Sequence, residues 1–273
     1  MKRILPLLLA VCTIATAAAQ STFTSTLKAK AKKGATTYGT VECDGKPLAG
    51  VQVSDGYEIT TTDKRGVYNL TSAKRNGYVF ITLPSGYEAP TEGDDVVPQF
   101  WANLTADAQT AERHDFALRK VDNLRHVVVA ITDIHIANHL DDIGQFKRNV
   151  MPRINEEVEK YRSQGIPVYT ICMGDSSFDS FWYDFLFDIR DFRPLLADVK
   201  YPTPFFHSMG NHDNNGAHPE GPDTDFLATD RVREAFGPTY YSFNIGGIHY
   251  VMLDNIFYIL HIIGVHHKER GFH

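Results

Sequence analysis

Three short segments of the chain place side chains that bind metal ions directly after apolar runs. They are Thr132-Asp133-Ile134-His135, Gly174-Asp175-Ser176-Ser177-Phe178-Asp179 and Gly210-Asn211-His212-Asp213. Carboxylate and amide oxygens suit hard divalent cations, and imidazole suits transition metals such as zinc and iron. A cation held by such a set polarises a phosphoryl oxygen and activates water, so the pattern predicts metal-assisted hydrolysis of a phosphoester.

The first segment taken alone has a plainer interpretation, a surface carboxylate beside a structural histidine. Gly174 permits a sharp turn after a strand, and the carboxylate of Asp175 has one oxygen for each of two cations. Asn211 offers an amide oxygen to a second cation, while His212 beside it is suited to proton transfer with a substrate. The placement of all three segments after apolar strands is what favours one shared site.

The elements that must position these segments are predicted from the apolar periodicity. Continuous apolar runs predict strands over 126–132, 168–173 and 203–209. Helical patterns separate them, so the order strand, helix, strand, helix, strand indicates a largely parallel sheet. Ligands of such sheets gather outside the carboxyl ends of the strands, where all three segments fall.

Each predicted helix has an apolar face. The first carries Phe146, Val150, Ile154, Val158 and Tyr161 at helical spacing, and its face is predicted to lie in the core. The second is predicted from about residue 180 to residue 199. Its apolar face carries Phe181, Phe185, Ile189 and Leu195.

The first residues have the pattern of a secretory signal. Lys2 and Arg3 precede the apolar run 4–14, and a small-residue stretch ends at Ala19, so cleavage is expected before Gln20 and the signal spans 1–19. The alternatives are a membrane anchor, for which the run falls short of about 20 residues, and a lipoprotein acylated at Cys12. A periplasmic or secreted protein without a later transmembrane segment is predicted.

The next part of the chain is predicted to be β-rich. Residues 20–37 have no apolar periodicity and are expected to form a flexible leader. From 38 to 118, short β-type runs alternate with turns, which predicts a β-sandwich, and 119–125 is a charged linker. The amino-acid sequence of 38–118 resembles transthyretin-like, carboxypeptidase-regulatory-like sandwich modules. For this module a role in structural support is favoured over a role in ligand binding.

In this order the three motifs resemble the calcineurin-like metallophosphoesterase superfamily. Its signature runs Asp-x-His, Gly-Asp-x-x-Asp, Gly-Asn-His-Asp/Glu, a lone His and Gly-His-x-His. The stretch from Phe236 to Asn255 also resembles the hairpin of that family after the third motif. With its sandwich, the chain is similar to secreted members of Bacteroides type. The implied fold is an all-β sandwich followed, over 126–273, by an αββα metallophosphoesterase domain.

The resemblance implies roles for individual residues. Two divalent ions, of manganese, iron or zinc, would be bound by Asp133 and His135 on one side, by Asn211 on the other and by Asp175 between them. A hydroxide held between the ions would attack phosphorus in line, and His212 would protonate or orient the leaving oxygen.

Asp179 would support His212, although it follows Asp175 by four residues where the signature has three. Asp213 is expected to cap or turn the chain. Structural or exposed positions are expected for the other nearby histidines, His139, His207 and His218.

The chain departs from this signature after Asn255. The histidines at 261, 266, 267 and 273 do not form Gly-His-x-His, and the second half of the domain is expected to be incomplete. The alternative to a phosphoesterase of the cell envelope is therefore a catalytically defective binding or scaffold protein there.

The composition of the chain limits the classes of partner that are expected. The chain of 273 residues is 43% hydrophobic, which fits a globular protein, and its net charge is -6. An acidic chain has no general attraction for nucleic acid, so no nucleic-acid partner is expected and the substrate is a small or envelope phosphoester. Cys43 and Cys172 are predicted to be buried thiols rather than a disulfide.

Overall fold

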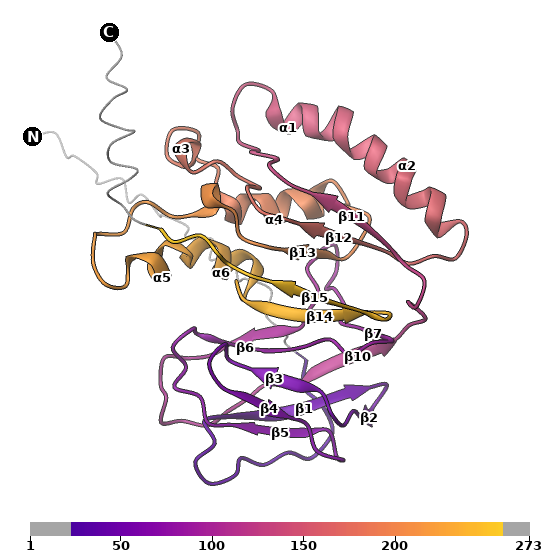
Figure 1. Cartoon of the computed structure of the whole chain (residues 1–273), viewed down its shortest axis with the longest axis vertical. Coiled ribbons are helices and arrows are strands. Elements are labelled where there is room, and N and C mark those ends of the chain that lie inside the picture. The colour runs from indigo at the N-terminus through magenta and orange to yellow at the C-terminus, as the bar shows by residue number, and fades with distance from the viewer. Residues whose placement is uncertain (1–22, 259–273) are drawn as a thin grey trace, which may run out of the picture.

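The computed structural model of the chain describes residues 23–258. A β-rich N-terminal part lies below a second part of mixed strands and a few helices (Figure 1). The predicted signal, 1–19, and the C-terminal histidines lie outside the described residues. Among the residues that are described, no helix is both long and apolar enough to cross a membrane.

The N-terminal part is built from ten short strands in two sheets. One sheet has the order β2-β1-β10-β7, with β5 and β9 also paired to β1, and the other has the order β4-β3-β6-β8. The strands are β1 (Thr37–Cys43), β2 (Lys46–Pro47), β3 (Gln52–Ser54), β4 (Ile59–Thr61), β5 (Val67–Leu70), β6 (Tyr78–Ile81), β7 (Tyr87–Glu88), β8 (Trp101–Asn103), β9 (Glu112–Arg113) and β10 (Phe116–Lys120).

The apolar residues of these strands alternate into a common core, which explains why the short runs form sheets. Val41, Val53, Val79 and Phe116 are completely buried between the two sheets. The strand β8 was not predicted, because Trp101-Ala102-Asn103 lies outside any alternating run. It pairs with β6, a contact that only the folded chain supplies.

The segment expected to be a flexible leader is held against the sandwich where it is described. The hydroxyl of Ser25 donates to Glu42, and its backbone N–H donates to Asp115 at 3.1 Å. Further along, the N–H of Lys32 donates to Asn69 at 2.7 Å. The segment has no apolar periodicity because it forms neither helix nor strand, yet these polar contacts fix its path.

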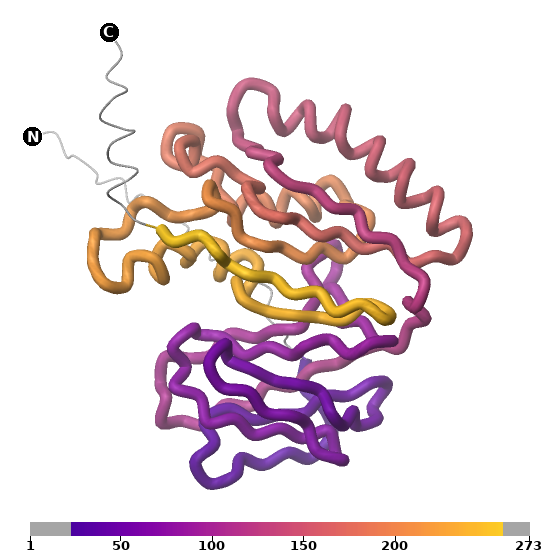
Figure 2. Tube along the Cα trace, viewed as in Figure 1, coloured from indigo at the N-terminus to yellow at the C-terminus, as the bar shows by residue number. Residues whose placement is uncertain are grey.

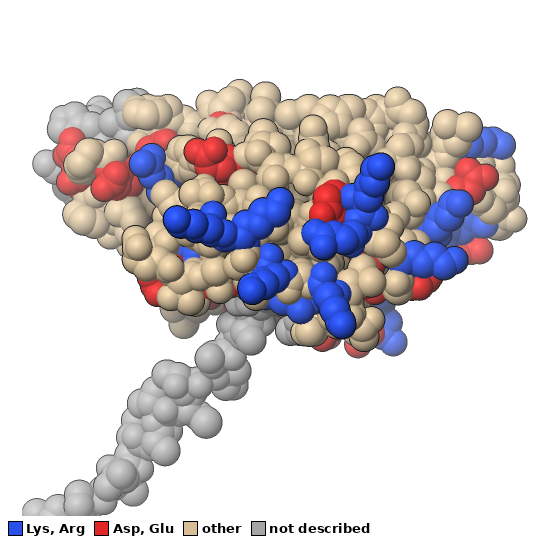
Figure 3. Space-filling view, turned by 90° about the horizontal axis from the view of Figure 1, so that it is seen from below, with Lys and Arg blue, Asp and Glu red and all other residues tan. Residues whose placement is uncertain are grey.

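This leader places a row of lysines on the surface. Lys28, Lys30 and Lys32 are exposed and alternate with the half-buried Ala29 and Ala31 along the segment. On the face of the molecule that is seen from below, Lys and Arg side chains are more prominent than Asp and Glu side chains (Figure 3). The overall negative charge therefore conceals a basic face, which a charge count along the chain does not reveal.

The second part begins with a parallel sheet. Its order is β11-β12-β13, with Val127 opposite Val168 and Cys172 opposite His207. The bounds are β11 (Val127–Ile131), β12 (Val168–Cys172) and β13 (Phe205–His207). The parallel sheet predicted from the apolar runs is therefore present, with each strand shorter than expected.

Helices and helical turns separate and follow these strands. They are α1 (Asp142–Gln145), the π-helical turn η1 (Phe146–Val150), α2 (Met151–Arg162), α3 (Asp179–Trp182), α4 (Ile189–Asp198), the 3-10 turn η2 (Asn211–Asp213), α5 (Thr224–Ala228) and α6 (Asp230–Phe236). The helices α2 and α4 pack on β12 and β13 through a core that includes Ile154, Val158, Phe192 and Phe205.

The prediction that Val150 lies on the core face was wrong. Within η1 the N–H of Met151 donates to the carbonyl of Phe146, five residues earlier, instead of four. This wider turn rotates the following residues, so Phe146 and Met151 are buried while Val150 is 43% exposed.

The second predicted helix is split. Asp188 caps the start of α4 by accepting from the N–H of Arg190 at 2.8 Å, while Asp191 accepts from the N–H of Asp188. This capping box begins a new helix at Ile189. Phe181 and Phe185 therefore lie before α4, half-buried, and not on a continuous core face as predicted.

A hairpin fills the space between the parallel sheet and the sandwich. It consists of β14 (Tyr241–Ile245) and β15 (Ile248–Met252), at the position of the hairpin that the sequence resembled. The ring of Phe243 stacks on Phe206 of β13 at 4.0 Å, and Phe243 bridges to Leu83 of the sandwich. The yellow end of the chain thus returns between the two parts (Figure 2).

A further contact joins the parts. Arg193 of α4 makes a hydrogen-bonded ion pair with Asp95 of the N-terminal part. Among the described residues the second half of the predicted αββα domain is represented by the hairpin alone, and the sandwich covers the other face of the hairpin.

Cys43 and Cys172 are buried free thiols, as predicted.

Candidate metal centre

The loops that follow β11 and β12 are joined by backbone hydrogen bonds. The N–H of Asp133 donates to the carbonyl of Gly174 at 3.2 Å, and the N–H of His135 donates to that of Asp175 at 3.0 Å. These bonds continue the parallel pairing beyond the strand ends. They bring the first two motifs together, as expected for the carboxyl edge of a parallel sheet.

The second and third motifs approach through two glycines. A Cβ on Gly174 would lie 2.5 Å from the backbone of Gly210, and Gly174 has a φ of 96°, which favours glycine. A Cβ on Gly210 would lie 2.2 Å from Oδ1 of Asp175. Glycine at both positions is therefore a requirement of the close contact between these loops.

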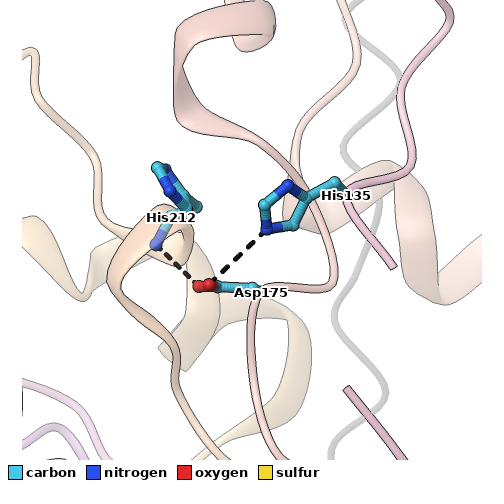
Figure 4. Close-up of side chains that lie close together, drawn as sticks. All are labelled: His135, Asp175 and His212. Atoms are coloured by element: carbon cyan, nitrogen blue, oxygen red, sulfur yellow. Dashed lines mark hydrogen bonds and ion pairs between the residues drawn. The ribbon is translucent and has the colours of Figure 1, made fainter. Parts of the chain in front are cut away.

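Side chains of all three loops converge at this point (Figure 4). Potential ligand atoms of His135, Asp175 and His212 lie within 4.8 Å of one another. Nε2 of His135 is 3.5 Å from Oδ2 of Asp175 and 3.9 Å from Oδ1 of Asp133. The structure thus brings together Asp133, His135 and Asp175, three of the four predicted metal ligands.

Three of these residues have left-handed backbones. The φ angles are 52° for Asp133, 47° for His135 and 52° for Asp175. The positive φ angles of Asp133 and His135 set the direction in which these two side chains leave the loop after β11. Such conformations are costly for residues other than glycine and gather at functional sites.

The fourth predicted ligand, Asn211, begins η2 beside His212. The residue is exposed, and its backbone carbonyl accepts from Nδ2 of Asn214 at 3.1 Å. Asn211 is therefore an exposed chain neighbour of His212, and no hydrogen bond of its side chain to His135 or Asp175 is present among the described residues.

His212 is held from two sides. Its backbone N–H donates to Oδ1 of Asp175 at 2.8 Å, and its Nδ1 lies 2.9 Å from Oδ1 of Asp179. The spacing of four residues between Asp175 and Asp179 therefore still allows the predicted contact. Asp179 orients the ring, leaving Nε2 of the imidazole without a carboxylate partner among the described residues.

Asp213 is buried beneath these loops. Its carboxylate accepts from the N–H groups of Asp175 at 2.9 Å, Gly210 at 3.1 Å and Ser177 at 3.3 Å. Burial raises the pKa of Asp213 to about 7, and these backbone bonds oppose the rise. Asp213 caps the turn, in line with its expected role.

A buried polar chain behind Asp213 was not predicted. Nε2 of His207 lies 3.1 Å from the hydroxyl of Ser176, which lies 3.1 Å from the thiol of Cys172. Burial lowers the pKa of His207 to about 3 and raises that of Cys172 to about 12. The sequence signal was only that His207 ends an apolar strand; its neutral, buried state follows from packing.

Phe178 was also missed, although it lies inside the second motif. Its ring stacks on His135 with centroids 5.2 Å apart and lies 4.5 Å from the ring of His212. One aromatic side chain therefore contacts both imidazoles of the site and limits their rotation.

Comparison with known protein families bears on the N-terminal part. Residues 35–121 match the family model described as the N terminal of calcineurin-like phosphoesterase. This supports the calcineurin-like phosphoesterase superfamily. The matched segment covers the sandwich and ends before the three motifs, and the superfamily is generally metal-dependent. A comparison with curated proteins finds no match.

The donor set fits a divalent cation. Nε2 of His135 is a buried nitrogen that has no hydrogen-bond partner among the described groups, although it faces two carboxylates. A cation would satisfy this nitrogen and offset the charges of Asp133 and Asp175 together.

Proposed function

We propose that this protein hydrolyses phosphomonoesters or phosphodiesters with the help of divalent metal ions. Asp133, His135 and Asp175 would hold one ion, and Asp175 with Asn211 would contribute to a second. The observation that carries the proposal is the orphaned Nε2 of His135, 3.5 Å from Asp175 and in the left-handed loop after β11. The family match of the sandwich supports the same class of reaction.

The ions would supply Lewis-acid polarisation of the phosphoryl oxygens and a lowered pKa for water. The chain's own groups then have defined tasks. In the reaction a bond forms between the oxygen of water and phosphorus, the bond to the leaving oxygen breaks, and a proton passes to that oxygen. Nε2 of His212 is placed to hold and deliver this proton, because Nδ1 is engaged by Asp179.

The test is a calorimetric titration of the full chain with Mn²⁺, followed by an assay with an aryl phosphate. We expect binding and metal-dependent turnover, and at least tenfold weaker binding for Asp175→Asn. Asp184→Asn is the matched control, because Asp184 is exposed. Mn²⁺ binding that is equal in wild type and Asp175→Asn would reject the site. Binding without turnover would favour the alternative, a binding or scaffold protein of the envelope.

We further propose that the protein acts in the periplasm or outside the cell. The support is the signal pattern of residues 1–19, with Lys2, Arg3 and an apolar run before Ala19. Amino-terminal sequencing of the protein recovered from separate cell fractions tests this. A mature chain that begins at Gln20 is expected outside the cytoplasm, and an uncleaved cytoplasmic chain would contradict it.

A further inference from the structure

Two leucines beside the candidate metal centre are exposed and strained at once. Leu140 is 91% exposed with a φ of 48°, and Leu186 is 85% exposed with a φ of 50°. A leucine in this conformation is costly, and an exposed one gains no burial in return. The fold itself therefore does not account for leucine at either position.

The two leucines follow directly on rings that touch each other. Leu140 follows His139, and Leu186 follows Phe185, and the centroids of these two rings are 4.7 Å apart. The ring of His139 also stacks on Phe181 at 4.8 Å. The three rings contact one another, and the two leucines are the exposed chain neighbours of two of them. We call these five residues the apolar wall: His139, Leu140, Phe181, Phe185 and Leu186.

The apolar wall is continuous with the metal centre. The ring of Phe181 lies 4.8 Å from that of Phe178, which in turn stacks on His135 at 5.2 Å. Phe178, Phe181 and Phe185 are all half-buried, so their rings retain accessible surface. A phosphoryl group at His135 and Asp175 would thus have a hydrocarbon surface extending from it on one side.

We propose that the apolar wall binds a hydrocarbon chain carried by the leaving group of the substrate, so that the substrate is a phosphoester of a long-chain alcohol. The inference rests on the proposed function, because the metal centre must hold the phosphoryl group. A chain lying on the wall would cover Leu140 and Leu186 and remove apolar surface from water on both sides. Contact with the hydrocarbon chain would then explain why leucine occupies these two strained positions.

The test compares two phosphonates that share a head group. Methylphosphonate and octylphosphonate, below its micelle concentration, are titrated calorimetrically into the Mn²⁺-loaded full chain. We expect octylphosphonate to bind about tenfold more tightly, as hydrophobic contacts in a site allow. In Leu140→Ser/Leu186→Ser this advantage should fall to less than threefold, with methylphosphonate unchanged. Leu124→Ser is the matched control, since Leu124 is 77% exposed and lies in the linker.

The outcomes separate the two proposals. Equal binding of both phosphonates by the wild type overturns the apolar wall and leaves the metal centre intact. An octyl advantage that survives the double serine substitution also overturns it. If neither phosphonate binds, the proposed function fails and the inference falls with it. Sedimentation of the same samples tests whether a second copy of the chain occupies the wall. If the wild type is a dimer and the Leu140→Ser/Leu186→Ser variant is a monomer, the wall is an interface between two copies of the chain.

Discussion

The backbone N–H of Asp175 donates to Oδ2 of Asp213 at 2.9 Å, across the gap between the loops that follow β12 and β13. The same oxygen accepts from Gly210 at 3.1 Å, so one carboxylate oxygen holds the backbones of two motifs. The position of the Asp175 side chain therefore depends on a residue that need not touch a metal.

Asp213→Asn should lower the free energy of unfolding by about 2 kcal/mol. The amide keeps one acceptor but turns an NH₂ group toward at least one buried N–H, leaving it unsatisfied. Urea denaturation of the full chain measures the change, with the exposed Asp184→Asn as the control. If the Asp213→Asn variant is as stable as wild type, these bonds contribute nothing to the fold.

Gly210→Ala should weaken Mn²⁺ binding at least tenfold and lower stability by about 1–3 kcal/mol. Its Cβ would lie 2.2 Å from Oδ1 of Asp175 and 2.3 Å from the nitrogen, so Asp175 must move. Calorimetric titration and thermal unfolding measure the two effects. Gly221→Ala, which meets nothing within 4 Å, should change neither.

His212→Asn should lower kcat about 100-fold or more and leave Mn²⁺ affinity within threefold of wild type, because the imidazole is assigned to proton transfer. The assay is metal-dependent hydrolysis of an aryl phosphate. A tenfold loss of Mn²⁺ affinity would instead make His212 a ligand, which its position within 4.8 Å of the other donor atoms allows.

Asp179→Asn should lower kcat about tenfold through its 2.9 Å contact with His212. In the double variant Asp179→Asn/His212→Asn, the loss of kcat should be smaller than the product of the two single losses, since both residues act on the same proton transfer. Fully multiplicative losses would show that Asp179 acts independently of His212.

His207→Phe should change the pH dependence of stability. Burial lowers the pKa of His207 from 6.5 to about 3, so between these values the unfolded chain binds a proton that the folded chain does not. Wild type therefore loses stability as pH falls through this window, at up to about 1.4 kcal/mol per pH unit. The variant lacks this loss, while Asp213, 3.7 Å away, is common to both proteins.

Urea denaturation of both proteins at pH 7, 6 and 5 measures this difference. The His207→Phe variant is expected to be less stable at pH 7, because Ser176 loses one of its two hydrogen-bond partners and keeps only Cys172. Its deficit should shrink as pH falls. A deficit that stays constant across the three pH values would show that His207 titrates normally in the folded chain.

Much of the candidate site could be read from local patterns. Asp133, Asp175 and Asn211 each follow an apolar run, and parallel strands end at the same edge of a sheet. The contact of Asp179 with His212 was implied by the family resemblance and not by a local pattern. For Asp133, Asp175 and Asn211, short-range periodicity and chain order were enough, because these predictions depend on which element a residue ends, not on how it packs.

The leader depended on contacts between distant segments, because Ser25 is held by Asp115. The start of α4 at Ile189 has a local pattern, the capping box of Asp188 and Asp191, which was missed because the apolar spacing continues across it. The π-helical turn that exposes Val150 has no distinct local pattern.

The sequence by itself determined which residues can bind a cation and the edge of the sheet at which they meet. The tertiary structure alone decided how they are aimed and what surrounds them. The left-handed turns at Asp133 and His135 and the stacking of Phe178 on His135 arise when two loops far apart in the chain pack together. Side-chain direction and burial are set by that packing, and periodicity along the chain carries no information about it.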